Sequence, residues 1–84
     1  GALAVDATGA AFAPALDVPV RTTTGAGDAM VAGLLLALAG GAGLTDALRH
    51  GTAAAAARCL CAGDAFLHRT DFDALLPQTR ADSL

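Results

Sequence analysis

The chain has 84 residues, of which 55% are hydrophobic and 15% are charged. A chain of this length forms at most one small domain and buries only about 60% of its unfolded surface. The hydrophobic side chains therefore require more buried surface than the chain alone provides. The formal net charge of -3, the pI near 4.9 and the lack of Trp and Tyr argue against a nucleic-acid partner.

The N-terminal part of the chain predicts a β-hairpin. Strands are expected in residues 2–6 and 11–16, on either side of a turn that contains Gly9. Pro14 has no N–H to donate, which keeps the second strand short or at an edge. Residues 17–22 then read as a connector that ends in an extended run.

Residues 29–39 carry no polar side chain and predict a helix that begins near Ala26 and ends at the glycines of residues 40–43. A helix that is apolar all round must be covered on all sides, and we expect much of that cover to lie outside this chain, which begins with Gly1 rather than Met. The run is shorter than the ~20 residues that span a membrane, so no membrane association is expected. Gly33 costs about 1 kcal/mol relative to Ala, which close approach of another backbone would explain.

A second helix is predicted from Thr45, as its N-cap, to about Leu60. Gly51 and the alanines of residues 53–57 leave one of its faces almost without bulk. Either another helix packs tightly there or a flat ligand such as a purine lies against it. The two cysteines of this region read as small buried side chains in a reducing compartment, which together with the lack of a signal-peptide pattern predicts a cytoplasmic location and no metal site.

The C-terminal part predicts a loop over residues 62–68 and a short last helix. Thr70-x-x-Asp73 resembles a capping box that opens this helix, and Pro77 stops it. Residues 78–84 are expected to fray. The arginines read as solvated, with a place near a bound nucleotide as the alternative for two of them, Arg49 and Arg58.

The most informative stretch is residues 22–28, Thr-Thr-Thr-Gly-Ala-Gly-Asp, which leads into the apolar helix. Such a loop gathers free backbone N–H groups and the positive end of the helix dipole, which favours a bound anion such as phosphate. The carboxylate of Asp28 would repel phosphate unless it had a task, and the expected task is to accept a proton from a hydroxyl about to be phosphorylated. A P-loop needs Lys after Gly27, and a dinucleotide fingerprint needs Gly or Ala where Met30 stands, so neither fits.

This loop and the start of the following helix resemble the second signature of the ribokinase/PfkB family of carbohydrate kinases. The order of hairpin, connector, signature, Gly-rich loop, Ala-rich helix and short last helix is similar to the C-terminal third of that family. The resemblance implies that residues 1–84 are a C-terminal fragment of a three-layer α/β/α ribokinase-like fold, without the N-terminal substrate-binding part. The matching residues are Thr23, Gly25, Ala26, Gly27, Asp28, Ala32, Gly33, Leu34 and Leu35.

Residues 51–76, with Gly63 and Asp71, are most similar to the phosphofructokinase-like branch. The implied reaction is ATP-dependent phosphoryl transfer to a hydroxyl of a sugar or sugar phosphate. Asp28 is then the general base. The N–H groups of Gly25, Ala26 and Gly27 form an anion hole for the γ-phosphoryl group. Residues Gly51, Ala54 and Ala55 lie beside the adenine.

The resemblance places the Mg²⁺ ligands and the sugar pocket upstream of this segment, so the remainder of the kinase domain is its first partner and the fragment alone is expected to be inactive. Thr22 stands where relatives carry Asp or Asn, a position that in them shapes the loop or a nearby monovalent-cation site. The resemblance therefore gives no ground for K⁺ activation.

Three alternatives stay open. Nucleoside-type members such as pseudouridine kinases share the Gly-Ala-Gly-Asp-Ala-Met run, so pseudouridine or ribose is an alternative acceptor. A non-catalytic nucleotide- or anion-binding module, or a decayed relative, is a second. A structural helical hairpin is a third, although it leaves Asp28 unexplained. The oligomeric state also stays open, a homodimer included.

Overall fold

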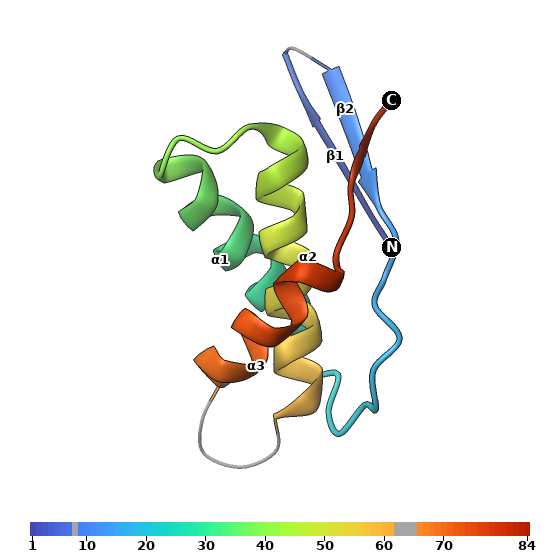
Figure 1. Ribbon diagram of the computed structural model, residues 1–84, viewed down its shortest axis with the longest axis vertical. Helices are drawn as coiled ribbons and strands as arrows, with labels where there is room; N and C mark the ends of the chain where they lie inside the picture. The colour runs from blue at the N-terminus through green and yellow to red at the C-terminus, as the bar shows by residue number, and fades with distance from the viewer. Residues whose placement is uncertain (8, 62–65) are drawn as a thin grey trace.

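The computed structural model describes residues 1–7, 9–61 and 66–84. It is a mixed α/β arrangement in which a small antiparallel sheet lies beside two long helices, with a shorter helix against the second of them (Figure 1). In chain order the elements are β1 (Ala2–Asp6), β2 (Gly9–Ala13), α1 (Ala26–Ala39), α2 (Leu44–Leu60), α3 (Arg69–Leu75), a 3-10 turn (Leu76–Gln78) and β3 (Asp82–Ser83).

The predicted hairpin is confirmed, with a correction to its second strand. β1 pairs with β2 in a register that runs from Ala2 opposite Ala13 to Asp6 opposite Gly9. The second strand was expected over residues 11–16 but lies two to three residues earlier and ends just before Pro14. Proline cannot donate to a ladder, so the pairing stops where it enters.

The expectation of a frayed C-terminal tail is wrong for its last residues. β3 pairs antiparallel with β2, with Ala11 opposite Ser83 and Phe12 opposite Asp82, and the N–H of Leu84 donates to the O of Ala10 at 2.8 Å. The free edge of β2 offers unpaired N–H and C=O groups, and the tail satisfies them.

Both long helices are confirmed, but the predicted N-cap of the second is wrong. The cap residue is Gly43 in an extended conformation, and Thr45 lies inside the first turn of α2. The O of Gly43 accepts the N–H of Ala47 at 2.9 Å, so the helix begins before the first side chain that could cap it.

The predicted capping box of α3 is also wrong. His68 is the N-cap residue, no side chain caps the helix, and Asp73 instead accepts a hydrogen bond from Nε of Arg69 at 3.1 Å. The expected stop at Pro77 is confirmed, because α3 ends at Leu75 and the 3-10 turn that contains Pro77 follows. The predicted loop over residues 62–68 lies partly outside the described residues, and Gly63 lies outside them altogether.

Arg49 is not a solvated side chain. Its guanidinium donates to Oγ1 of Thr79 at 3.1 Å, to Oδ1 of Asp46 at 3.0 Å and to the O of Leu76 at 3.2 Å. These bonds tie the segment after α3 to the first turns of α2, and so guide the tail toward β2.

α1 and α2 pack with their backbones in near contact. A Cβ atom on Gly51 would lie 2.8 Å from the O of Met30, and one on Gly33 would lie 2.9 Å from Cβ of Ala54 and from the O of His50. The close backbone approach expected at Gly33 is therefore confirmed, and at Gly51 helix packing is the alternative that the structure shows. A Cβ atom on Gly33 or Gly51 would clash with the facing helix, so glycine at these two positions allows the close approach.

The core consists of two clusters along α2. The sheet packs on its N-terminal half around Ala11, Ala13 and Leu48. The connector and α3 pack on its C-terminal half, around Ala53, Ala56, Ala57 and Leu75.

Large apolar side chains remain exposed on the outer face of the hairpin and along α1, of which only Ala29 is buried. None of the helices in the described part of the chain is long and apolar enough to cross a membrane. The exposed side chains on these two elements are Leu3, Val5, Phe12, Val31, Leu35, Leu36 and Leu38.

Candidate functional site

Residues 22–28 lie between the connector and α1, and their first residue is anchored to the end of α2. The carbonyl oxygen of Cys59 accepts the N–H of Arg21 at 2.7 Å and that of Thr22 at 3.2 Å. The connector that leads to this point runs alongside α2 (Figure 1). The position of the loop is therefore set by a helix that begins about twenty residues later in the chain.

The loop is shaped by local hydrogen bonds and by one left-handed residue. The hydroxyl Oγ1 of Thr22 accepts the N–H of Thr24 at 3.2 Å, and the N–H of Ala26 donates to the O of Thr23 at 3.3 Å. Asp and Asn side chains make the same bond to the residue two positions on, so Thr22 can shape this turn in their place. Gly25 has φ 82°, a conformation that side chains with a Cβ atom rarely adopt.

The N-terminus of α1 carries the groups that sequence reasoning selected. Gly25 is the N-cap and no side chain caps the helix, and the first carbonyl-to-amide bond of the helix joins the O of Gly25 to the N–H of Ala29 at 2.9 Å. Within the described part of the chain, the N–H groups of Gly25 and Gly27 have no acceptor, whereas that of Ala26 is taken by the long bond to Thr23. Two of the three N–H groups predicted for an anion hole are thus available for one.

Asp28 lies in the first turn of α1, where it is exposed. None of the described residues makes a hydrogen bond or ion pair to its carboxylate. The carboxylate and the available N–H groups therefore belong to the same helix end. Such an end can hold a phosphate on its amides while the carboxylate accepts a proton from a neighbouring hydroxyl.

Arg58 contacts this loop, which its interpretation as a solvated side chain did not predict. Its Nε donates to the O of Thr24 at 2.8 Å, and its Nη1 donates to the O of Phe66 at 2.9 Å and to the O of Cys61 at 3.4 Å. Its guanidinium carbon lies 4.9 Å from the centre of the Phe66 ring. No spacing in the sequence indicates a contact between residues that stand 34 positions apart.

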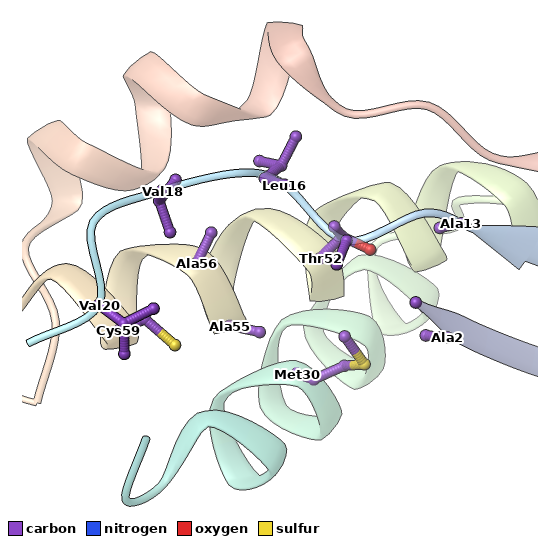
Figure 2. Close-up of a pocket in the computed structure, with 12 residues that line it drawn as sticks. Ala2, Ala13, Leu16, Val18, Val20, Met30, Thr52, Ala55, Ala56 and Cys59 are labelled. Atoms are coloured by element: carbon purple, nitrogen blue, oxygen red, sulfur yellow. The ribbon is translucent and has the colours of Figure 1, made fainter. Parts of the chain in front are cut away.

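A cavity of about 150 Å³ lies between the connector, α1 and α2 (Figure 2). Val18 and Val20 of the connector, Met30 of α1 and Ala55 of α2 contribute to its apolar wall. The hydroxyl of Thr52, which also lines it, donates to the O of Leu48 at 2.8 Å. The cavity is smaller than the ~300–1,000 Å³ typical of ligand pockets.

The three residues predicted to lie beside an adenine stand on one side of α2 and have different surroundings. Ala55 lines this cavity, whereas Gly51 faces the backbone of α1 at Met30. Ala54 is buried against Gly33 and borders a second cavity of about 450 Å³ between the three helices. Because residues three and four positions apart are neighbours on a helix, Gly51 lies between Ala54 and Ala55 on the surface of α2.

Comparison with known families finds a match over most of the chain. A family model described as pfkB family carbohydrate kinase matches residues 1–70, which include the hairpin, both long helices, the loop of residues 22–28 and Arg58. No curated protein matches the chain.

Proposed function

This chain belongs to the pfkB family of carbohydrate kinases, and we propose that it contributes the general base and the anion hole to ATP-dependent phosphoryl transfer onto a hydroxyl of a sugar or sugar phosphate. The observation that carries the proposal is the helix end at residues 25–28. It combines a left-handed glycine, two N–H groups without an acceptor in the described chain, and an exposed carboxylate.

In the proposed reaction, Asp28 accepts the proton of the acceptor hydroxyl as its oxygen attacks the γ-phosphorus of ATP. The bond from the γ-phosphorus to the bridging oxygen breaks, and ADP leaves with that oxygen. The N–H groups of Gly25 and Gly27 and the positive end of the α1 dipole stabilise the charge on the phosphoryl oxygens, which is the main contribution a protein makes to this reaction. Ala26 adds to this cradle once its bond to Thr23 opens.

We place the adenine along the connector, beside Ala55. Val20 lines the cavity there and stands two residues before the loop, so a nucleotide could reach from the cavity to the helix end. The small size of the cavity means that the connector must move outward to admit a purine. Gly51 and Ala54 would then support the base indirectly, by fixing α1 against α2.

Mg²⁺ supplies charge neutralisation on the phosphates when it is bound. The described residues hold no cluster of three or more His, Cys, Asp or Glu side chains. The described residues therefore provide no all-protein metal cage, and we propose that the ion is held by the phosphates and by residues outside this chain.

We further propose that residues 1–84 work as the C-terminal part of a three-layer kinase domain. The support is the apolar surface on the outer faces of the hairpin and α1, where Val5 is 71% and Leu36 is 75% exposed. Large apolar side chains exposed in such number on two elements mark a place where more protein packs. In the full domain that cover also supplies the acceptor pocket.

For the acceptor we propose a sugar phosphate of the phosphofructokinase type, on the similarity of residues 51–76 to that branch. A panel of fructose 6-phosphate, fructose 1-phosphate, tagatose 6-phosphate, ribose and pseudouridine, assayed with the full-length gene product, separates this from a nucleoside-type kinase. Binding of ATP without transfer to any acceptor would favour the non-catalytic nucleotide-binding alternative.

The test of the mechanism is Asp28→Asn in the full-length protein. Because it removes the proton acceptor and leaves the backbone amides in place, phosphoryl transfer should fall at least ~10²-fold while ATP affinity changes little. Asp17→Asn is the matched control, since Asp17 is an exposed carboxylate on the connector. A near-normal rate for Asp28→Asn in a steady-state assay would refute the assignment of the base.

A further inference from the structure

Arg58 joins three segments at the loop of residues 22–28. It comes from the last turn of α2 and donates to the carbonyl oxygens of Thr24 before α1, Cys61 after α2 and Phe66 before α3. Planar guanidinium groups have donors in a fixed fork, so one arginine can bridge carbonyls that point toward it from different directions.

The bond to Thr24 fixes the orientation of one peptide group. A trans peptide is planar, so the C=O of Thr24 and the N–H of Gly25 point in opposite directions. Because the C=O is directed at Arg58, the N–H of Gly25 is directed away from it. Without this bond the peptide could rotate, since the glycine that follows tolerates a wide range of dihedral angles, and a carbonyl oxygen would then replace an N–H in the proposed anion hole.

The side chain of Phe66 lies beside both Arg58 and Gly25. The Phe66 ring lies under the guanidinium of Arg58, and a Cβ atom on Gly25 would lie 2.9 Å from Cε1 of the ring and 3.2 Å from Nε of Arg58. The pair therefore leaves no room for a side chain on Gly25. The loop has little room to shift toward α2 while both side chains are in place.

We propose that Arg58 is a positioning residue that holds the Thr24–Gly25 peptide with its N–H turned toward the transferred phosphoryl group. The proposal rests on the proposed function, since it assigns Arg58 to the same anion hole. Arg58 itself touches neither the acceptor nor the reacting atoms in this arrangement, and its effect passes through the loop.

The kinetic test compares three variants of the full-length protein. Arg58→Met removes all the donors, and kcat should fall about 10-fold or more, as expected for losing a charge-assisted hydrogen bond that the transition state needs, with KM for the acceptor within about twofold. Arg58→Lys keeps one donor within reach of Thr24 and should recover part of kcat. Arg69→Met is the matched control, because the guanidinium carbon of Arg69 also lies near a phenylalanine ring, 6.0 Å from the centre of Phe72, while its Nε donates to Asp73 and not to the loop.

Wild-type kcat in Arg58→Met would overturn the proposal. So would an equal loss in the Arg69→Met control, or a failure of Arg58→Lys to exceed Arg58→Met. If Arg58→Met does not fold, Arg58→Leu, which also has no donor, takes its place in the comparison, and wild-type kcat in it would overturn the proposal in the same way.

Hydrogen–deuterium exchange separates this proposal from the proposed function. In Arg58→Met, exchange should become faster in a peptide covering residues 21–29 and stay unchanged in one covering residues 44–54. If wild-type protein phosphorylates none of the acceptors, the proposed function fails, and the exchange experiment still decides whether Arg58 holds the loop. Unchanged exchange at residues 21–29 would overturn the positioning role whatever the kinetics show.

Discussion

Gly25 and Gly27 stand two residues apart, yet the structure predicts different outcomes when each becomes alanine. A Cβ atom on Gly27 meets no atom within 4 Å, and its φ is not positive. Gly27 lies in the first turn of α1, where Ala is favoured over Gly by up to about 1 kcal/mol. Gly27→Ala should therefore leave the protein as stable as the wild type, or raise Tm by up to about 2–4 °C for a protein of 150–250 residues.

The expected effect of Gly27→Ala on catalysis has the opposite sign. If a phosphoryl group approaches the N–H of Gly27, the added methyl group occupies space beside the phosphoryl oxygens and lengthens that hydrogen bond. Loss of one such donor costs about 10²–10³-fold in kcat at other oxyanion holes, and we expect at least ~10-fold here because the donor is displaced rather than removed.

Gly25→Ala should lower both stability and rate. Its φ of 82° costs about 1–2 kcal/mol for a residue with a Cβ atom. The contact of 2.9 Å with Cε1 of Phe66 adds an overpacking cost of about 1 kcal/mol or more. Thermal unfolding and steady-state kinetics of both variants in the full-length protein check the pair. Wild-type kcat/KM in Gly27→Ala would refute the approach of an anion to this N–H group, and a clearly lower Tm would refute the packing described for Gly27.

Two further outcomes follow from the packing. Gly51→Ala should destabilise the full-length protein by about 1 kcal/mol in a denaturant titration. A Cβ atom there would lie 2.8 Å from the O of Met30, and overpacking of about 1–3 kcal/mol outweighs a gain of about 1 kcal/mol in helix propensity. An unchanged midpoint would contradict the tight contact between α1 and α2. The isolated chain of residues 1–84 should self-associate through the exposed side of α1 in sedimentation experiments, and Leu35→Lys with Leu36→Lys should reduce this association, whereas a monomer before substitution would contradict it.

The sequence predicted the local elements well because their causes are local. An apolar run followed by glycines specified α1, and small residues specified the close contact of Gly33 and Gly51 with the facing helix. The loop before Asp28 could be predicted as a candidate site because its glycines indicate an unusual backbone conformation. Gly25 has the positive φ that this requires. The family followed from the same residues.

The errors arose where one segment depends on another. Thr45 and Thr70 are good capping residues by type, yet α2 and α3 begin earlier, because the carbonyl oxygens of Gly43 and His68 already accept the first helical N–H groups. The last residues carry no strand pattern, and they become β3 only because the edge of β2 is unpaired beside them.

By itself, therefore, the sequence determined the helices, the hairpin, the acidic end of the glycine loop and the kinase family. The tertiary structure decided which of these groups meet. It packed Gly51 against the backbone of α1, and it placed the guanidinium of Arg58 against the carbonyl of Thr24. The physical reason is that backbone conformation depends on neighbouring residues, whereas a long side chain finds its partners only after distant segments have packed.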